Sequence, residues 1–136
     1  MKHHTNLKTA LIVAALLALP VAQAATMSKD DYKAGKDRIG ADYKADKEAC
    51  APLADNAKDV CVEEAKAKEK VARAELEYSY TGKPSDQTKV MEVKAKTAYG
   101  VAREKCDDLK GTEKEVCVKE AKAARTKALA DIKMGK

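Results

Sequence analysis

The stretches CVEEAKAKEK, residues 61–70, and CVKEAKAART, residues 117–126, are nearly the same segment written twice. Aligning the chain with itself on these two stretches also places Cys50 on Cys106 and Leu53 on Leu109. Across residues 50–74, 12 of 25 positions are identical to their counterparts in the second copy. A composition rich in alanine and lysine produces some of these matches, but it does not explain the aligned cysteines. We therefore interpret the chain as an internal duplication.

Residues 1–24 have the three-part layout of a signal peptide. A short basic start precedes a run of about a dozen apolar residues, and Ala22 and Ala24 then occupy the small positions of an A-x-A cleavage site. A membrane-spanning helix needs roughly 18 to 20 apolar residues, and this run is shorter. We expect export to the periplasm, a cut after Ala24, and no stable membrane insertion once the leader is removed.

The sequence after residue 24 is helix-forming and poor in bulky side chains. It contains no His, Trp or Phe, and Val, Ile and Leu are scarce. Of the 27 Lys and Arg in the chain, only Lys2 and Lys8 lie in the leader, and the rest nearly balance the 22 Asp and Glu. Net charge therefore does not predict a nucleic-acid partner. Long alternating runs of Ala, Glu and Lys are typical of solvated helices, so the sequence predicts a small all-α protein with a thin core.

Turn signals divide each copy into two helices. Ser28, Asn56, Ser85 and the pair Thr112 and Glu115 are candidate helix starts. The segment TGKPS, residues 81–85, ends the second helix, with Gly82 suited to the C′ position just past the helix and Pro84 just beyond it. We predict two helical hairpins over residues 25–82 and 83–136, packed as a four-helix bundle or as an extended pair. Their inward stripes consist mainly of alanines: Ala65, Ala72, Ala98, Ala102, Ala121 and Ala128.

The four cysteines are the strongest structural signal. Each pair has ten residues between its members, and an exported domain with a thin core commonly uses disulfides. We expect Cys50–Cys61 and Cys106–Cys117, each closing one hairpin turn. The alternative pairing, Cys50–Cys117 and Cys61–Cys106, would resemble the twin-cysteine hairpins of mitochondrial import substrates. A zinc site or a redox pair fits this spacing poorly, because neither C-x-x-C nor a histidine is present after the leader.

Other candidate chemistry is weak. The pairs Asp30–Asp31 and Asp107–Asp108 lie near helix ends, where they are a candidate weak cation site or ordinary helix-capping charge. Tyr32, Tyr43 and Tyr99 lie on apolar stripes and are expected in the core. Tyr78 and Tyr80 lie near TGKPS, where a ligand could stack on them, but core packing is the preferred interpretation.

The segments DYKADKEAC (42–50), NAKDVCVEEAKAKEKVARAELEYSYTGK (56–83), AREKCDDL (102–109) and KEVCVKEAKAARTKALADIKMGK (114–136) resemble a group of small exported proteobacterial proteins. These proteins are sometimes labelled cell-envelope or TolA-like, after their Ala-Lys-Glu-rich helices. The resemblance implies an envelope protein and transfers no catalytic or binding residue.

We therefore expect a non-enzymatic periplasmic protein with a structural or interaction role in the cell envelope, no cofactor, and an envelope protein as partner. Two alternatives stay open. One is a stress-responsive holdase that exposes apolar stripes, and the other is a weak metal- or polyanion-binding protein. The sequence does not indicate the oligomeric state.

Overall fold

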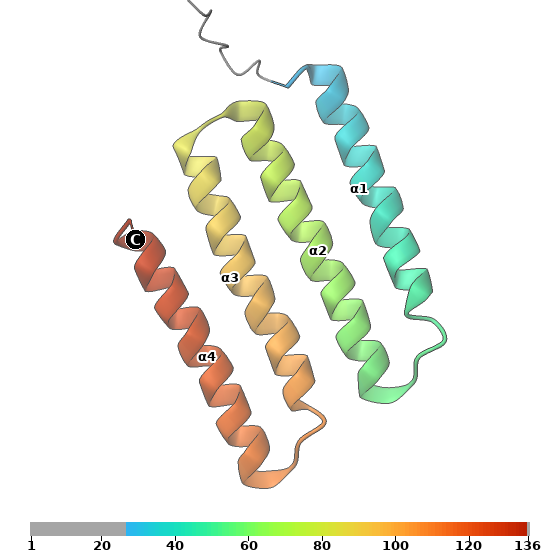
Figure 1. The fold of residues 1–136 in the computed structure, drawn as a ribbon, viewed down its shortest axis with the longest axis vertical. Coiled ribbons are helices and arrows are strands. Elements are labelled where there is room, and N and C mark those ends of the chain that lie inside the picture. The colour runs from blue at the N-terminus through green and yellow to red at the C-terminus, as the bar shows by residue number, and fades with distance from the viewer. Residues whose placement is uncertain (1–26, 136) are drawn as a thin grey trace, which may run out of the picture.

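The structure, a computed structural model, describes residues 27–135. Four helices follow one another: α1 (Lys29–Ala49), α2 (Asp55–Thr81), α3 (Pro84–Cys106) and α4 (Gly111–Lys133). They run alternately up and down, as the predicted hairpins require (Figure 1). Both cysteine-flanked turns lie at one end of the molecule and the α2–α3 turn lies at the other. The all-α prediction of two disulfide-closed hairpins is confirmed.

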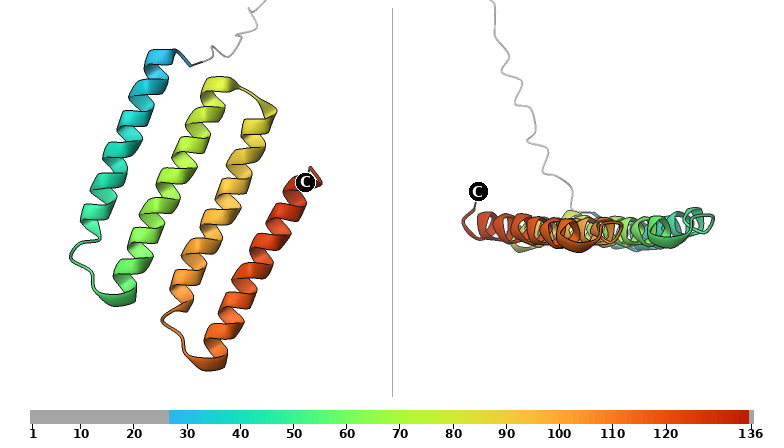
Figure 2. Two further views of the ribbon diagram at one scale, coloured as in Figure 1. Left: turned by 180° about the vertical axis from the view of Figure 1, so that it is seen from behind. Right: turned by 90° about the horizontal axis from the view of Figure 1, so that it is seen from below.

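The helices lie in a single layer. Helix α1 contacts α2, α2 contacts α3, and α3 contacts α4, while no other helix pair within residues 27–135 is in contact. Seen from one end, the layer is one helix thick (Figure 2). Of the two predicted arrangements, the closed bundle is therefore not formed. The inner helices α2 and α3 keep two open faces, and the outer helices α1 and α4 are also open on one side.

Few side chains are removed from solvent in such a layer. The buried residues in the described part are Cys50, Ala65, Ala74, Val90 and Cys106. The predicted alanine stripes are therefore only partly correct, because Ala98 is exposed and Ala72 and Ala102 are only half-buried. A closed bundle would cover those three alanines with a second pair of helices, and the layer has none.

Glycine allows α1 to approach α2 closely. A Cβ on Gly35 would lie 2.7 Å from Leu76 Cδ1, inside van der Waals contact. Near the same end of this hairpin, the rings of Tyr32 and Tyr80 stack with their centroids 4.4 Å apart. Stacked aromatic pairs stabilise beyond the area they bury. Tyr32 is only partly buried and does not reach the core predicted for it, and Tyr80 stacks on it instead of on a ligand.

Two of the predicted helix ends are confirmed. The Ser28 hydroxyl accepts a hydrogen bond from the Asp31 amide at 3.0 Å, which caps α1. Gly82 ends α2 in the left-handed region with φ 64°, and its N–H donates to the Tyr78 carbonyl.

The predicted starts of the other three helices are wrong. Asn56 lies inside α2, where its Nδ2 donates to the Glu104 carbonyl of α3 at 3.0 Å instead of capping its own helix. Ser85 also lies inside its helix, because Pro84 occupies the first turn with its φ already suited to a helix. The pair Thr112 and Glu115 forms no capping box, since α4 begins one residue earlier at Gly111.

The predicted leader, residues 1–24, and its cleavage after Ala24 lie outside the described residues. Among the helices that the structure describes, none combines the length and apolarity that crossing a membrane requires.

Candidate functional site

The disulfides fix the two hairpin turns. Cys50 bonds to Cys61 and Cys106 bonds to Cys117, each with a Cα–Cα distance of 5.7 Å. The predicted pairing is therefore confirmed, and the cross-hairpin alternative is not found. All four cysteines are used in these bonds, so none is a thiolate for zinc or redox chemistry in this state.

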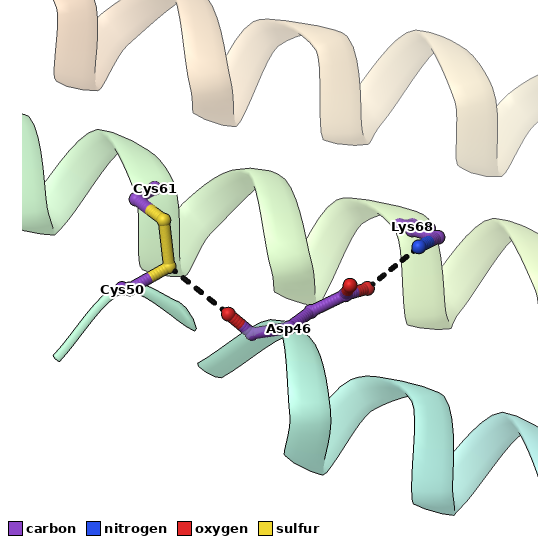
Figure 3. The surroundings of a disulfide bond; sticks show 4 residues. All are labelled: Asp46, Cys50, Cys61 and Lys68. Atoms are coloured by element: carbon purple, nitrogen blue, oxygen red, sulfur yellow. Dashed lines mark hydrogen bonds and ion pairs between the residues drawn. A yellow bond between two sulfur atoms is a disulfide. The ribbon is translucent and has the colours of Figure 1, made fainter. Parts of the chain in front are cut away.

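Next to the first disulfide, an ion pair also links α1 to α2 (Figure 3). Cys50 Sγ lies 3.2 Å from the Asp46 carbonyl oxygen, and the Asp46 carboxylate accepts from Lys68 Nζ at 2.8 Å. A disulfide sulfur has no proton to donate, so the sulfur–oxygen contact is one of packing. The Asp46 hydrogen bond and charge raise the pKa of Lys68 above its ordinary value. This end of hairpin one is therefore held by a covalent bond and an ion pair.

A groove runs between α2 and α3 on one face of the layer. Its volume is about 610 Å³, and eleven residues line it: Ala67, Lys68, Val71, Ala72, Glu75, Lys94, Thr97, Ala98, Val101, Ala102 and Lys105. Its apolar lining comes from four alanines and two valines, whose short side chains leave the two helix backbones close to solvent. We call this surface the alanine groove.

Ion pairs cross the alanine groove at both ends. Lys94 Nζ lies 2.6 Å from Glu75 Oε1, and Lys105 Nζ lies 2.8 Å from Glu64 Oε1. Both pairs join α2 to α3. The two acids are eleven positions apart on α2, which corresponds to about 16 Å of helix. The open apolar stretch is therefore about three helical turns long.

The opposite face carries two hollows. The first, of about 300 Å³, spans α1, α2 and α3 and is lined by Tyr32, Lys36, Arg73, Ala74, Leu76, Glu77, Asp86 and Lys89. The second, of about 480 Å³, lies between α3 and α4 and is lined by Lys96, Arg125, Thr126, Leu129, Ala130 and Lys133. We call them the first and second cationic hollows.

Helical periodicity places these hollows away from the alanine groove. Lys89 and Lys96 are two helical turns apart and share one stripe of α3. Lys96 follows Lys94 and precedes Ala98 by two positions each, which is about 200° around the helix. On α2, Arg73 is likewise two positions from Val71 and from Glu75. The alanine groove and the two cationic hollows therefore open on opposite faces of the layer.

Three polar contacts orient side chains, two of them at the first cationic hollow and one at the α3–α4 turn. The Tyr32 hydroxyl donates to Glu77, and this hydrogen bond raises the pKa of Tyr32 above its ordinary value. The Thr81 hydroxyl donates to Asp86 in the turn between α2 and α3. At the α3–α4 turn, the hydrogen bond from Lys114 lowers the pKa of Asp107.

One acid of each predicted acidic pair is engaged by another side chain. Asp31 accepts from Ser28, and Asp107 pairs with Lys114. Within residues 27–135, no three His, Cys, Asp or Glu side chains lie close enough together to hold a metal ion. The acids of the helix ends therefore serve capping and pairing.

Sequence reasoning missed both the alanine groove and the cationic hollows. The signal was present in α3, where Met91, Ala98 and Ala102 recur on one side and Lys89 and Lys96 on another. Reading that pattern as a surface requires knowing that no fifth element covers it. Comparison with protein-family models, with curated proteins and with solved structures returned no match.

Proposed function

We propose that this protein is a non-enzymatic interaction module of the periplasmic cell envelope, which binds a partner protein in the alanine groove. The observation that carries the proposal is the groove itself, an apolar surface left open on the central helix pair of a single layer. Helix faces of this kind are normally buried against another layer. A partner would supply that layer.

The groove fits an amphipathic helix of about three turns. Its alanine floor allows a helix backbone to approach at the short end of the usual range of about 8–10 Å. The charges at its two ends, Lys94 with Glu75 and Lys105 with Glu64, are solvent-exposed pairs of the kind that contribute little stability. On binding, each of these lysines and glutamates can instead pair with a charge of opposite sign on the partner. The partner helix should therefore carry small apolar residues on one stripe and both signs of charge beside it.

The periplasmic location is supported by two features of the chain. The leader over residues 1–24 has the layout of an export signal, and two disulfides in a small domain are typical of an oxidising compartment. Cell fractionation with N-terminal sequencing tests this part. We expect a periplasmic protein that begins at Ala25, and a cytoplasmic protein that retains the leader would contradict it.

Site-specific photocrosslinking tests the partner. A photoreactive amino acid at Ala98, on the groove, should yield a defined adduct in intact cells. The same amino acid at Ala34, an exposed alanine of α1 away from the groove, should not. The purified partner should then bind the wild type and lose affinity for Ala98→Arg, while Ala34→Arg binds normally. Equal crosslinking from both positions, or binding unaffected by Ala98→Arg, would exclude the groove as the site.

A holdase is the second candidate, because the alanine groove is exposed without any rearrangement of the described helices. Such a protein would bind many unfolded clients rather than one helix. Aggregation of a chemically unfolded client should then be suppressed by the wild type and less by Ala98→Arg, with and without reductant. Unchanged aggregation at a several-fold molar excess would remove this candidate.

A further inference from the structure

The two cationic hollows carry a strong local excess of positive charge. Together their linings contain the cations Lys36, Arg73, Lys89, Lys96, Arg125 and Lys133, but only the acids Glu77 and Asp86. Both acids already accept hydrogen bonds, Glu77 from Tyr32 and Asp86 from Thr81. The net charge of these linings is therefore positive, although the Lys and Arg after the leader nearly balance the Asp and Glu.

Three of these cations are available to an external anion. Lys36, Lys89 and Lys133 are exposed and make no ion pair within residues 27–135. Arg73 and Lys96 instead pair with acids of their own helices. The three unpaired lysines come from α1, α3 and α4, so they are spread across the layer.

Two of the lining cations lie against tyrosine rings. Lys36 Nζ lies 4.8 Å from the Tyr32 ring centroid, and Arg125 lies 4.1 Å from the Tyr99 ring centroid. These rings orient the cations without neutralising their charge.

The three lysines that line the alanine groove are each paired with an acid. Lys68 pairs with Asp46, Lys94 with Glu75 and Lys105 with Glu64, all within 2.8 Å. Each of these pairs joins two neighbouring helices. The three groove lysines are thus all paired with acids, whereas of the six cations that line the hollows only Arg73 and Lys96 form ion pairs within residues 27–135, with Glu69 and Glu92.

We call the face that carries both hollows the cationic face, and it is flat. The four helices lie in one layer (Figure 2), and the lining cations come from α1, α2, α3 and α4. A flat array can contact many charges of a flat surface at once. A linear polyanion would follow only one stripe of it.

We propose that the cationic face adsorbs to a bilayer surface rich in anionic phospholipid headgroups. The hollows receive headgroup phosphates, and the alanine groove then faces away from the membrane. Adsorption involves no insertion of helices, and it goes beyond the partner binding described above. Each lysine near such a surface contributes about 1 kcal/mol, which is about a fivefold change in binding constant.

Vesicle binding of the full mature chain tests this proposal with matched variants. One variant removes three cations from the cationic face, Lys36→Gln, Lys89→Gln and Lys133→Gln. The control removes three from the groove face, Lys68→Gln, Lys94→Gln and Lys105→Gln, so both lose the same charge. Circular dichroism confirms that both fold. Flotation is measured with vesicles of phosphatidylcholine that contain a minority of phosphatidylglycerol, and with vesicles of phosphatidylcholine alone.

We expect binding to the anionic vesicles only, loss of that binding in about 0.5 M salt, and about 100-fold weaker binding by the cationic-face variant. The control should change by less than about threefold. Equal loss in both variants would mean that net charge alone drives adsorption and would overturn the assignment of a face. Binding to heparin without binding to anionic vesicles would overturn the lipid assignment. Partner crosslinking from Ala98 is a separate readout, so the two proposals can fail independently.

Discussion

Hairpin one, α1 with α2, and hairpin two, α3 with α4, share a repeated sequence pattern but are closed differently. Both have a disulfide at the turn end. At the other end, hairpin one has the Tyr32–Tyr80 stack and the Gly35–Leu76 contact. Hairpin two has Thr88 where hairpin one has Tyr32, and the 40% exposed Met91 where hairpin one has Gly35. Each hairpin therefore has the same disulfide at its turn, but the helices of hairpin one pack more closely at the other end than those of hairpin two.

Removing each disulfide in turn should produce the largest effect. The two loops have the same sequence separation of 11, so each bond should stabilise by about 3 kcal/mol through the unfolded chain. The Cys106→Ser, Cys117→Ser variant should nevertheless lose more than the Cys50→Ser, Cys61→Ser variant. Helix α4 then keeps the exposed Asp107–Lys114 pair and the Arg125–Tyr99 contact, whereas α1 keeps the tyrosine stack and the close Gly35–Leu76 contact.

Urea unfolding and hydrogen exchange of each helix measure this difference. In the hairpin-two variant, α4 should exchange at nearly unprotected rates while α2 stays protected. In the hairpin-one variant, α1 should keep partial protection near Tyr32. Equal losses and equal exchange in α1 and α4 would show that the stack contributes nothing to closure.

The tyrosine stack itself gives the second effect. Tyr80→Leu keeps an apolar side chain on α2 but removes the ring that stacks on Tyr32. We expect a loss of about 1 kcal/mol, confined to hairpin one. Tyr43→Leu, on α1 but outside the stack, is the control and should cost less. Exchange rates of α1 and of α4 under both substitutions would show whether the effect stays in hairpin one.

The first residues of α2 and α4 have the same backbone conformation but different side chains, so each can be replaced by the other's residue. Asp55 opens α2 with φ 50°, and its counterpart Gly111 opens α4 with φ 55°. Glycine adopts this region without a steric penalty and Asp adopts it at some cost. Asp55→Gly should therefore stabilise hairpin one, and Gly111→Asp should destabilise hairpin two, each by about 0.5–1 kcal/mol. Chemical denaturation midpoints check the signs, and two changes of the same sign would contradict the shared geometry.

The sequence predicted the covalent frame and the hairpins because these depend on local signals. Duplicated cysteines mark both turns, and Gly82 followed by Pro84 marks the third. The single layer could not be predicted in the same way. An alanine at position 72 or 98 suits both a buried seam and an open groove, and only the missing contact between α1 and α4 decides between them.

The helix starts show a second limit of local reasoning. Asn56 has the residue type of a cap, yet it lies beside α3 and bonds to the Glu104 carbonyl. Its counterpart, Thr112, has no following helix to contact within the described residues. A pattern shared by both copies therefore predicted the same role for two residues that have different neighbours.

The stability of the α3–α4 turn should depend more on pH at acidic pH than that of the α1–α2 turn, because only the α3–α4 turn has the Asp107–Lys114 ion pair. Asp107 pairs with Lys114 at 2.8 Å, and the counterpart of Asp107 in hairpin one is Ala51, opposite Lys58. The Lys114 hydrogen bond and charge lower the pKa of Asp107 below its ordinary value of 3.8. A lowered carboxyl pKa in the folded state means that the pair stabilises above about pH 4, and that this contribution is lost as pH falls through the folded pKa.

Two substitutions isolate this pair from the other carboxylates. Asp107→Asn should lower stability slightly at pH 7 and leave it unchanged at pH 2, while Ala51→Asp should add a contribution to hairpin one with the same pH dependence. Because both carboxylates are exposed, about 0.5 M salt should reduce both effects. Denaturant midpoints of the wild type and both variants at pH 7 and pH 2 measure the change. If Asp107→Asn lowers stability equally at both pH values, Asp107 acts through turn geometry rather than charge, and the turns differ in backbone conformation rather than in electrostatics.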